Sequence, residues 1–197
     1  MIAVSARAGL PLWLPADVGG HCCATIWHSK GYREGNSIMA NRIAESLSRW
    51  SNGGRLPIVC DASSCSFGII SEIIEYLTPE NRERHSRLKI FDSVAWAHDR
   101  LLPKLKIERK AASAVIRPSC SINHLNLAKK LHAIAAAMAD EAVTPAAAGC
   151  CAFVGDRGFL HAELTRSATA EEAEEVRARK FEAYLGELTR PREAIEH

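Results

Sequence analysis

Two pairs of adjacent cysteines constrain this chain more than any other feature. Cys22-Cys23 lies in the run GHCCA (20–24), and Cys150-Cys151 lies in AGCCA (148–152). Adjacent cysteines rarely bridge to each other, because disulfide geometry places the two Cα atoms several ångströms apart in a defined orientation. The total of seven cysteines is odd, which also argues against a disulfide framework. Clustered cysteines then indicate metal or redox chemistry, and the alternative is that they fill the core as small hydrophobes.

The surroundings of the two dyads are similar. Each dyad is followed by a triplet of a basic residue, glycine and an aromatic residue, which is KGY at 30–32 and RGF at 157–159. An acidic residue and a helix-like segment come next in both places. The dyads are 128 residues apart, from Cys22 to Cys150. This repetition predicts an internal duplication.

Periodicity of the apolar residues predicts strands that alternate with helices. Helices are expected at 36–50, 66–77, 93–102, 121–139 and 169–188, and strands at 56–59, 89–92, 112–116 and 142–144. The charged segment 104–110 lacks an apolar face and marks a boundary. We therefore expect an α/β fold of two similar cysteine-rich repeats, 1–105 and 106–197, each a small parallel sheet flanked by helices. Cys60 directly follows one strand, and Cys120 lies in the turn at the end of another, where sites form in such sheets.

The cysteine spacing favours one kind of metal centre. Thiolates are soft ligands that suit zinc, copper(I) or iron–sulfur clusters. Zinc sites usually contain closely spaced pairs such as C-x2-C, but four residues separate Cys60 from Cys65 and none separates the members of a dyad. Adjacent cysteines can bind neighbouring irons, because a multi-iron core offers several attachment points. The predicted ligands of a cluster, of 4Fe–4S type, are Cys22, Cys23, Cys60, Cys65, Cys120, Cys150 and Cys151.

These motifs resemble the cysteine-rich CCG domain, which occurs in a subunit of heterodisulfide reductase and in the glycolate oxidase iron–sulfur subunit. They are most similar to the C-terminal part of the fused FAD-linked D-lactate dehydrogenases (cytochrome), from about residue 6 to about residue 185. The similar segments are GHCCAT (20–25), WHSKGY (27–32), CDASSC (60–65), LTPENR (77–82), GCCAF (149–153) and GDRG (155–158).

The resemblance implies an electron-transfer module of an enzyme that oxidises a D-2-hydroxy acid such as D-lactate. Electrons would pass from a flavoprotein domain or subunit, through the iron–sulfur module, to a cytochrome or quinone. FAD would be bound only by a domain upstream of this chain, and no catalytic residue is assigned here. The chain would then be inactive as a dehydrogenase by itself.

Three departures from the family pattern leave alternatives open. Alanine follows both dyads (Ala24 and Ala152) where the name of the domain implies glycine. No cysteine precedes Cys22, and none follows Cys151, although the Cys23–Cys60 interval would place one near residue 188. Both repeats therefore look truncated. The four thiolates of the first repeat could hold a cubane cluster, whereas the three thiolates of the second repeat would leave one iron in need of another ligand. The alternatives are a remnant without a cluster and a thiol/disulfide redox subunit similar to heterodisulfide reductase.

Four further residues are weaker candidates for a supporting role. His21 and His28 lie beside the first dyad and could donate hydrogen bonds to sulfur, unless they are surface or capping histidines. Lys30 and Arg157 occupy matching places in the two repeats and could offset the negative charge of a cluster, unless they are simply solvated. The acidic stretch 171–175 is expected to complement the dipole of a helix N-terminus.

Composition excludes several classes of protein. Of the 197 residues, 25 are Lys or Arg and 23 are Asp or Glu, and this balance gives no indication of nucleic-acid binding. A hydrophobic content of 47% excludes disorder. No apolar run reaches the roughly 18 residues of a transmembrane segment. Pro11, Pro15 and Asp17 interrupt any signal-peptide core, so we expect a cytoplasmic location or the cytosolic face of a membrane.

Overall fold

The computed structural model describes residues 1–153 and 157–186 of the chain. It divides into two compact units, Met1–Leu101 (unit 1) and Leu102–His197 (unit 2). The sequence places the boundary four residues later, at 105/106. The two units are described separately below.

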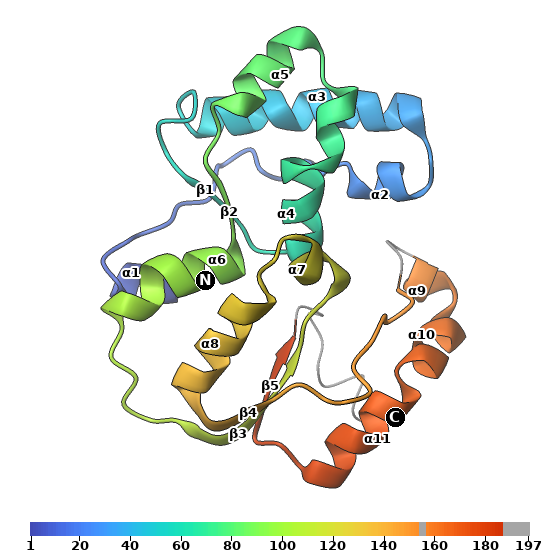
Figure 1. Ribbon diagram of the computed structural model, residues 1–197. Helices are drawn as coiled ribbons and strands as arrows, with labels where there is room; N and C mark the ends of the chain where they lie inside the picture. The colour runs from blue at the N-terminus through green and yellow to red at the C-terminus, as the bar shows by residue number, and fades with distance from the viewer. Residues whose placement is uncertain (154–156, 187–197) are drawn as a thin grey trace. The chain divides into compact units, whose positions relative to one another are not determined.

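Unit 1 contains helices around a short parallel sheet (Figure 1). Its elements are α1 (Ile2–Arg7), α2 (Thr25–Ser29), α3 (Arg33–Trp50), β1 (Ile58–Cys60), α4 (Ser63–Ile70), the 3-10 helix η1 (Glu72–Tyr76), α5 (Pro79–Ser86), β2 (Ile90–Asp92), α6 (Ser93–Trp96) and the π-helical turn η2 (Ala97–Leu101). Strands β1 and β2 are parallel, and Cys60 at the end of β1 is paired with Asp92 at the end of β2.

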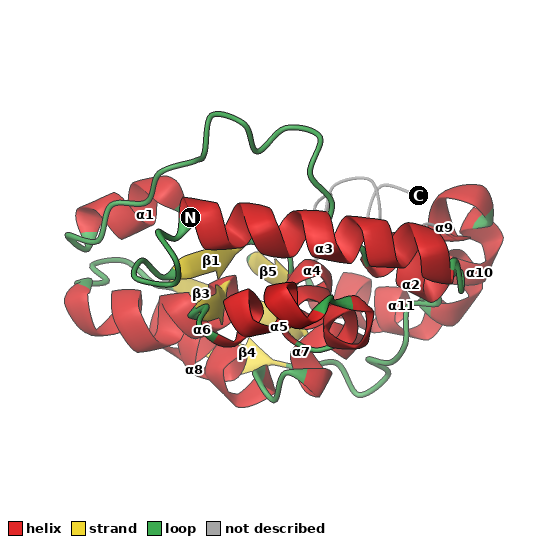
Figure 2. Cartoon of the chain, turned by 90° about the horizontal axis from the view of Figure 1, so that it is seen from above, coloured by secondary structure: helices red, strands yellow, loops and turns green. Residues whose placement is uncertain are grey.

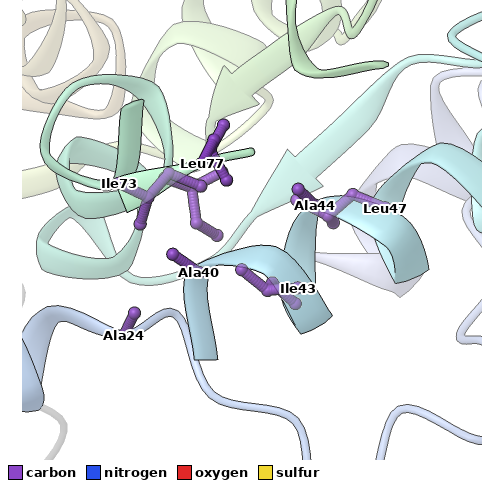
Figure 3. Close-up of a cluster of buried hydrophobic side chains, with 8 residues drawn as sticks. Ala24, Ala40, Ile43, Ala44, Leu47, Ile73 and Leu77 are labelled. Carbon is purple, nitrogen blue, oxygen red and sulfur yellow. The ribbon is translucent and has the colours of Figure 1, made fainter. Parts of the chain in front are cut away.

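The long helix α3 supplies one side of the unit 1 core (Figure 2). The spacing predicts an apolar stripe of Met39, Ile43, Leu47 and Trp50. Ile43 and Leu47 are buried together with Ala40 and Ala44, whereas Met39 and Trp50 are partly buried at its edge. The facing side chains come from α4, from η1 and the residue that follows it, and from the loop that carries the first dyad: Ala24, Ile69, Ile73 and Leu77 (Figure 3). Ala24, the residue after the first dyad, is therefore anchored in this core.

The helices of unit 1 differ from the prediction at several places. The helix expected at 66–77 begins earlier, at Ser63, so that Cys65 lies in its first turn, and it is interrupted at Ser71 before η1 begins. Helices α1 and α2 are not predicted, and neither is α5. The signal for it is nevertheless present, because the Thr78 side chain accepts the Asn81 N–H at the N-cap and Pro79 occupies the first turn.

Unit 2 is built on a three-stranded sheet of order β4-β3-β5, parallel throughout (Figure 1). Its elements are the 3-10 turn η3 (Leu102–Lys104), β3 (Ala111–Arg117), α7 (Cys120–His124), α8 (Ala128–Met138), β4 (Ala139–Val143), α9 (Arg157–Leu160), α10 (Ala162–Ala168), α11 (Ala170–Arg179) and β5 (Ala183–Gly186). The central strand β3 is buried from Ala114 to Arg117. The predicted α/β class with small parallel sheets is confirmed.

Two helix predictions in unit 2 are corrected. The helix expected at 121–139 is two helices, because Asn126 adopts a left-handed φ of 57° between α7 and α8. The helix expected at 169–188 ends at Arg179, where Lys180 is left-handed, and β5 follows; positions 187–188 lie outside the described residues. Pairing with β3 decides the conformation of 183–186 over local helical preference. In the described part of the chain, no helix has the length and apolarity to cross a membrane.

Candidate functional site: two thiol clusters

The four cysteines of unit 1 come from three separate elements and lie close together. Cys22 and Cys23 precede α2, Cys60 ends β1, and Cys65 lies in the first turn of α4. The thiol of Cys65 is hydrogen-bonded to Cys23, and Cys22 and Cys60 are near enough to act electrostatically on Cys65. All four are free thiols. The structure therefore brings together the four ligands predicted in the first repeat, here called the unit 1 thiol cluster.

A close contact between α2 and α4 holds two of these thiols in place. Thr25 Oγ1, at the start of α2, lies 3.5 Å from Cys23 Sγ and 3.4 Å from the carbonyl oxygen of Ser64 in α4. A Cβ added to Gly68 of α4 would lie 2.0 Å from the same Thr25 oxygen. Only glycine at position 68 lets the helices approach this closely. Neither Thr25 nor Gly68 is among the predicted site residues.

Hydrogen bonding and burial separate the proton affinities of these thiols. The hydrogen bond from the Cys65 thiol, together with those from Thr25, lowers the pKa of Cys23 to about 6. The same bond to Cys23, followed by burial, raises the pKa of Cys65. Burial, followed by the charges of Asp92 and Cys23, raises the pKa of Cys60 to about 11. Without a bound metal, Cys23 is therefore the most acidic of the four thiols, because the pKa values of the other three are raised.

A buried carboxylate faces Cys60 across the sheet. Asp92 is 2% exposed. Its Oδ1 accepts the Val94 N–H at the start of α6, at 2.8 Å, and its Oδ2 has no hydrogen-bond partner among the described residues. Asp92 is not among the predicted site residues. The signal was its position at the end of a predicted parallel strand, the same position that singled out Cys60.

The three cysteines of unit 2 also gather, as the unit 2 thiol cluster. Cys120 begins α7 just after β3, and the dyad lies in the loop between β4 and α9. Cys120 is hydrogen-bonded to Cys150, and Cys151 acts on it electrostatically. Both Cys120 and Cys150 are exposed, in contrast to the half-buried thiols of unit 1. The structure therefore unites the predicted ligands of each repeat within its own unit.

A buried ion pair fixes the loop that carries the second dyad. Arg117, 7% exposed, donates from Nε to both carboxylate oxygens of Glu172 at 2.7 Å, and from its terminal nitrogen to the carbonyl oxygen of Gly149 at 3.2 Å. The carboxylate of Glu175 accepts the backbone N–H groups of Ala146 and Ala147. The acidic stretch of α11 was predicted to serve the helix dipole, but two of its members hold this loop.

The two dyads share a backbone conformation. Ala24 and Ala152, which follow them, both have positive φ, 72° and 53°. In each case the alanine N–H is hydrogen-bonded to the first cysteine of the dyad, at 3.4 Å from Ala152 N to Cys150 Sγ. Both alanines thus adopt the left-handed conformation that glycine would take without strain, at a cost of about 1–2 kcal/mol each. The repeat seen in the sequence has this turn as its structural counterpart.

The four weaker candidates lie in varied surroundings. His21 Nε2 is 2.9 Å from Ser46 Oγ in α3, and its ring packs edge-on against Trp50. His28 Nε2 is 3.7 Å from Glu72 Oε1 in η1. Each histidine therefore connects the dyad region to another helix through an oxygen atom. Lys30 follows α2 and Arg157 begins α9, and both residues are exposed.

Within the residues that the structure describes, no group of three or more His, Cys, Asp or Glu side chains that could hold a metal ion is found. No family model, curated protein or solved structure matches the chain. The resemblance to the CCG domain therefore stays a prediction that rests on the motifs.

Proposed function

We propose that the unit 1 thiol cluster holds an iron–sulfur cluster and that the chain is an electron-transfer module. The observation that carries this proposal is the convergence of Cys22, Cys23, Cys60 and Cys65 from three elements far apart in the sequence. Core packing alone does not require four sulfur atoms to meet. Proximity of four thiols is what a four-cysteine cluster needs from its protein.

The donor set suits a multi-iron group better than one ion. Zinc sites usually contain closely spaced pairs such as C-x2-C, whereas here four residues separate Cys60 from Cys65 and none separates Cys22 from Cys23. The irons of a cluster offer separate attachment points, so adjacent Cys22 and Cys23 need not converge. When bound, such a group supplies one-electron transfer.

Several groups of unit 1 would tune and support this site. The backbone N–H of Ala24 is hydrogen-bonded to Cys22, and Thr25 Oγ1 contacts Cys23. Hydrogen bonds to sulfur and limited solvent exposure are the main protein contributions to the potential of a cluster. The α2–α4 contact through Gly68 keeps Cys23 and Cys65 together before any metal binds.

The resemblance of the motifs supplies the physiological context of the proposal. The electron donor is a reduced flavin on a separate domain or subunit of a D-2-hydroxy-acid dehydrogenase of the D-lactate type, and the acceptor is a cytochrome or quinone. The hydroxy-acid pocket belongs to the flavin domain, so the contribution of unit 1 to this reaction is electron transfer.

The proposal is tested by anaerobic reconstitution of the purified chain with iron and sulfide. We expect about four irons and four sulfides per chain and an electron paramagnetic resonance signal on reduction. Cys60→Ser removes both, whereas Cys120→Ser is the matched control from unit 2 and retains them. Circular dichroism verifies that each variant is folded. A folded wild-type chain without iron, or iron that depends on Cys120 and not on Cys60, contradicts the proposal and favours the cluster-free alternatives.

A further inference from the structure

The pairing of β1 with β2 holds a buried carboxylate, that of Asp92, beside Cys60. The two residues are register partners at the ends of two parallel strands. Neighbouring strands lie about 4.8 Å apart, and the side chains of register partners leave the sheet on the same face. One residue further on, Ser93 Oγ donates to the carbonyl oxygen of Asp61 at 3.4 Å, which keeps the two strand ends together. The carboxylate therefore lies on the same face of the sheet as the Cys60 thiol.

This carboxylate is fixed in place but only partly satisfied. Asp92 is 2% exposed, and its Oδ1 accepts the Val94 N–H at 2.8 Å. Its Oδ2 is buried and has no hydrogen-bond partner among the described residues. A buried polar atom without a partner is uncommon in folded proteins and calls for an explanation. Helix capping does not supply one, because asparagine or serine would accept the same N–H without burying a charge.

We propose that the charge of Asp92 lowers the reduction potential of the iron–sulfur cluster that the unit 1 thiol cluster is proposed to hold. This inference rests on the proposed function and deepens it. Reduction adds one electron and makes or breaks no bond, so the site becomes more negative by one charge. A carboxylate fixed nearby, away from solvent, opposes that change more strongly than it would in water. Asp92 is thus a positioning residue that acts across the Cys60 sulfur, and it favours passing the electron onward over retaining it.

The same charge acts on Cys60 when no iron is bound. After burial, the charge of Asp92 is the next cause that raises the pKa of Cys60 to about 11. Negative charge on this sulfur is therefore opposed by the same neighbour that would oppose reduction. Asp61 offers a contrast, because it is adjacent to Cys60 in the chain but exposed. Solvent and salt screen an exposed charge, so Asp61 should have little influence on the same sulfur.

The test compares reduction potentials of the full chain after anaerobic reconstitution, by redox titration followed by electron paramagnetic resonance. Asp92→Asn keeps the size and the helix cap and removes the charge. We expect it to shift the equilibrium toward the reduced cluster by roughly tenfold, which corresponds to about 59 mV for a one-electron couple. Asp61→Asn is the matched control and should leave the potential nearly unchanged. Asp92→Ser, which also caps helices, should reproduce the shift and replaces Asp92→Asn if that variant does not fold.

A second measurement needs no iron. The reduced, iron-free chain is treated with iodoacetamide at neutral pH, and alkylation of Cys60 is followed by mass spectrometry. The thiolate is the reactive form, so Cys60 should react severalfold faster in Asp92→Asn and at the wild-type rate in Asp61→Asn. Circular dichroism verifies that the variants are folded.

Two results would overturn the role of Asp92. One is a loaded protein whose potential is the same with and without the Asp92 carboxylate, or shifts equally in Asp61→Asn. The other is an alkylation rate of Cys60 that does not respond to Asp92→Asn, because the carboxylate would then not act on this sulfur. A folded wild-type chain that takes up no iron would instead refute the proposed cluster, and the effect on its potential with it. Iron content therefore distinguishes failure of the proposed function from failure of this inference.

Discussion

Substitution of Gly68 by alanine probes the contact that holds the unit 1 thiol cluster together. The new Cβ would lie 2.0 Å from Thr25 Oγ1 and 3.3 Å from Thr25 Cβ. Ordinary contact begins at 3.4 Å, so the oxygen and the new methyl must separate by about 1.4 Å. Thr25 is a short β-branched side chain and cannot rotate away without losing its contacts with Cys23 and Ser64.

Two effects of opposite sign set the size of the change. Overpacking costs about 1–3 kcal/mol, whereas alanine in the middle of a helix is favoured over glycine by about 1 kcal/mol. We therefore expect Gly68→Ala to lower the free energy of unfolding by about 0–2 kcal/mol. Because this net value is small, the decisive quantity is the coupling with Thr25. Thr25→Ala removes the clashing oxygen, so Gly68→Ala in that background should be neutral or stabilising.

A double-mutant cycle measured by urea denaturation tests this reasoning. We expect an interaction energy of about 1–3 kcal/mol between positions 25 and 68. Gly19→Ala is the matched control, because a Cβ there meets nothing within 4 Å and its effect should stay within about 0.5 kcal/mol. The Cys23 pKa gives a second measurement: loss of the contact should move it up from about 6 toward the ordinary value of 9.0. Additive effects of the two substitutions, with an unchanged Cys23 pKa, would refute the argument.

Three other expectations concern single features of the two units. Arg117→Met leaves Glu172 buried without its partner and should lower the free energy of unfolding in urea by about 3–5 kcal/mol. The double variant with Glu172→Leu should recover most of this loss. If it recovers none, the loss does not come from the ion pair. Ala152→Gly relieves a left-handed conformation at a half-buried position and should stabilise unit 2 by about 1 kcal/mol. Ala24→Gly relieves the same conformation but also removes a fully buried methyl group, so the gain in stability should be smaller or zero. In the iron-free chain, the Cys23 pKa lies below its unfolded value of 9.0. The contribution of Cys23 to the free energy of unfolding is therefore complete above pH 9 and is lost as the pH falls through about 6. A Cys23→Ser variant whose stability keeps the same dependence on pH would show that Cys23 is not the cause.

Periodicity and strand–helix alternation were sufficient to predict the class of fold. The stripe on α3 and the strand that ends at Cys60 follow from local residue patterns, and both are observed. Strand β5 could not be predicted in this way, because its conformation depends on pairing with β3, about 69 residues earlier in the chain. Tertiary pairing of this kind leaves little trace in a local window.

The sequence also identified the cysteines but not what positions them. Spacing and repetition singled out all seven, and the structure gathers them as groups of four and three. Arg117, Asp92 and Gly68 were missed, because a buried ion pair, a strand register and a close helix contact are relations between segments. A lone arginine in a turn and a lone glycine in a helix have no distinctive local pattern.

The strand order of unit 2 has a consequence for the kinetics of folding. Strand β3 meets β4 across about 28 residues, from Ala111 to Ala139, but meets β5 across about 69, from Ala114 to Ala183. Closing the longer loop costs more chain entropy and gives the sheet a high contact order, which slows folding. The β3–β4 half should therefore be the easier to form, and docking of β5 the slower step.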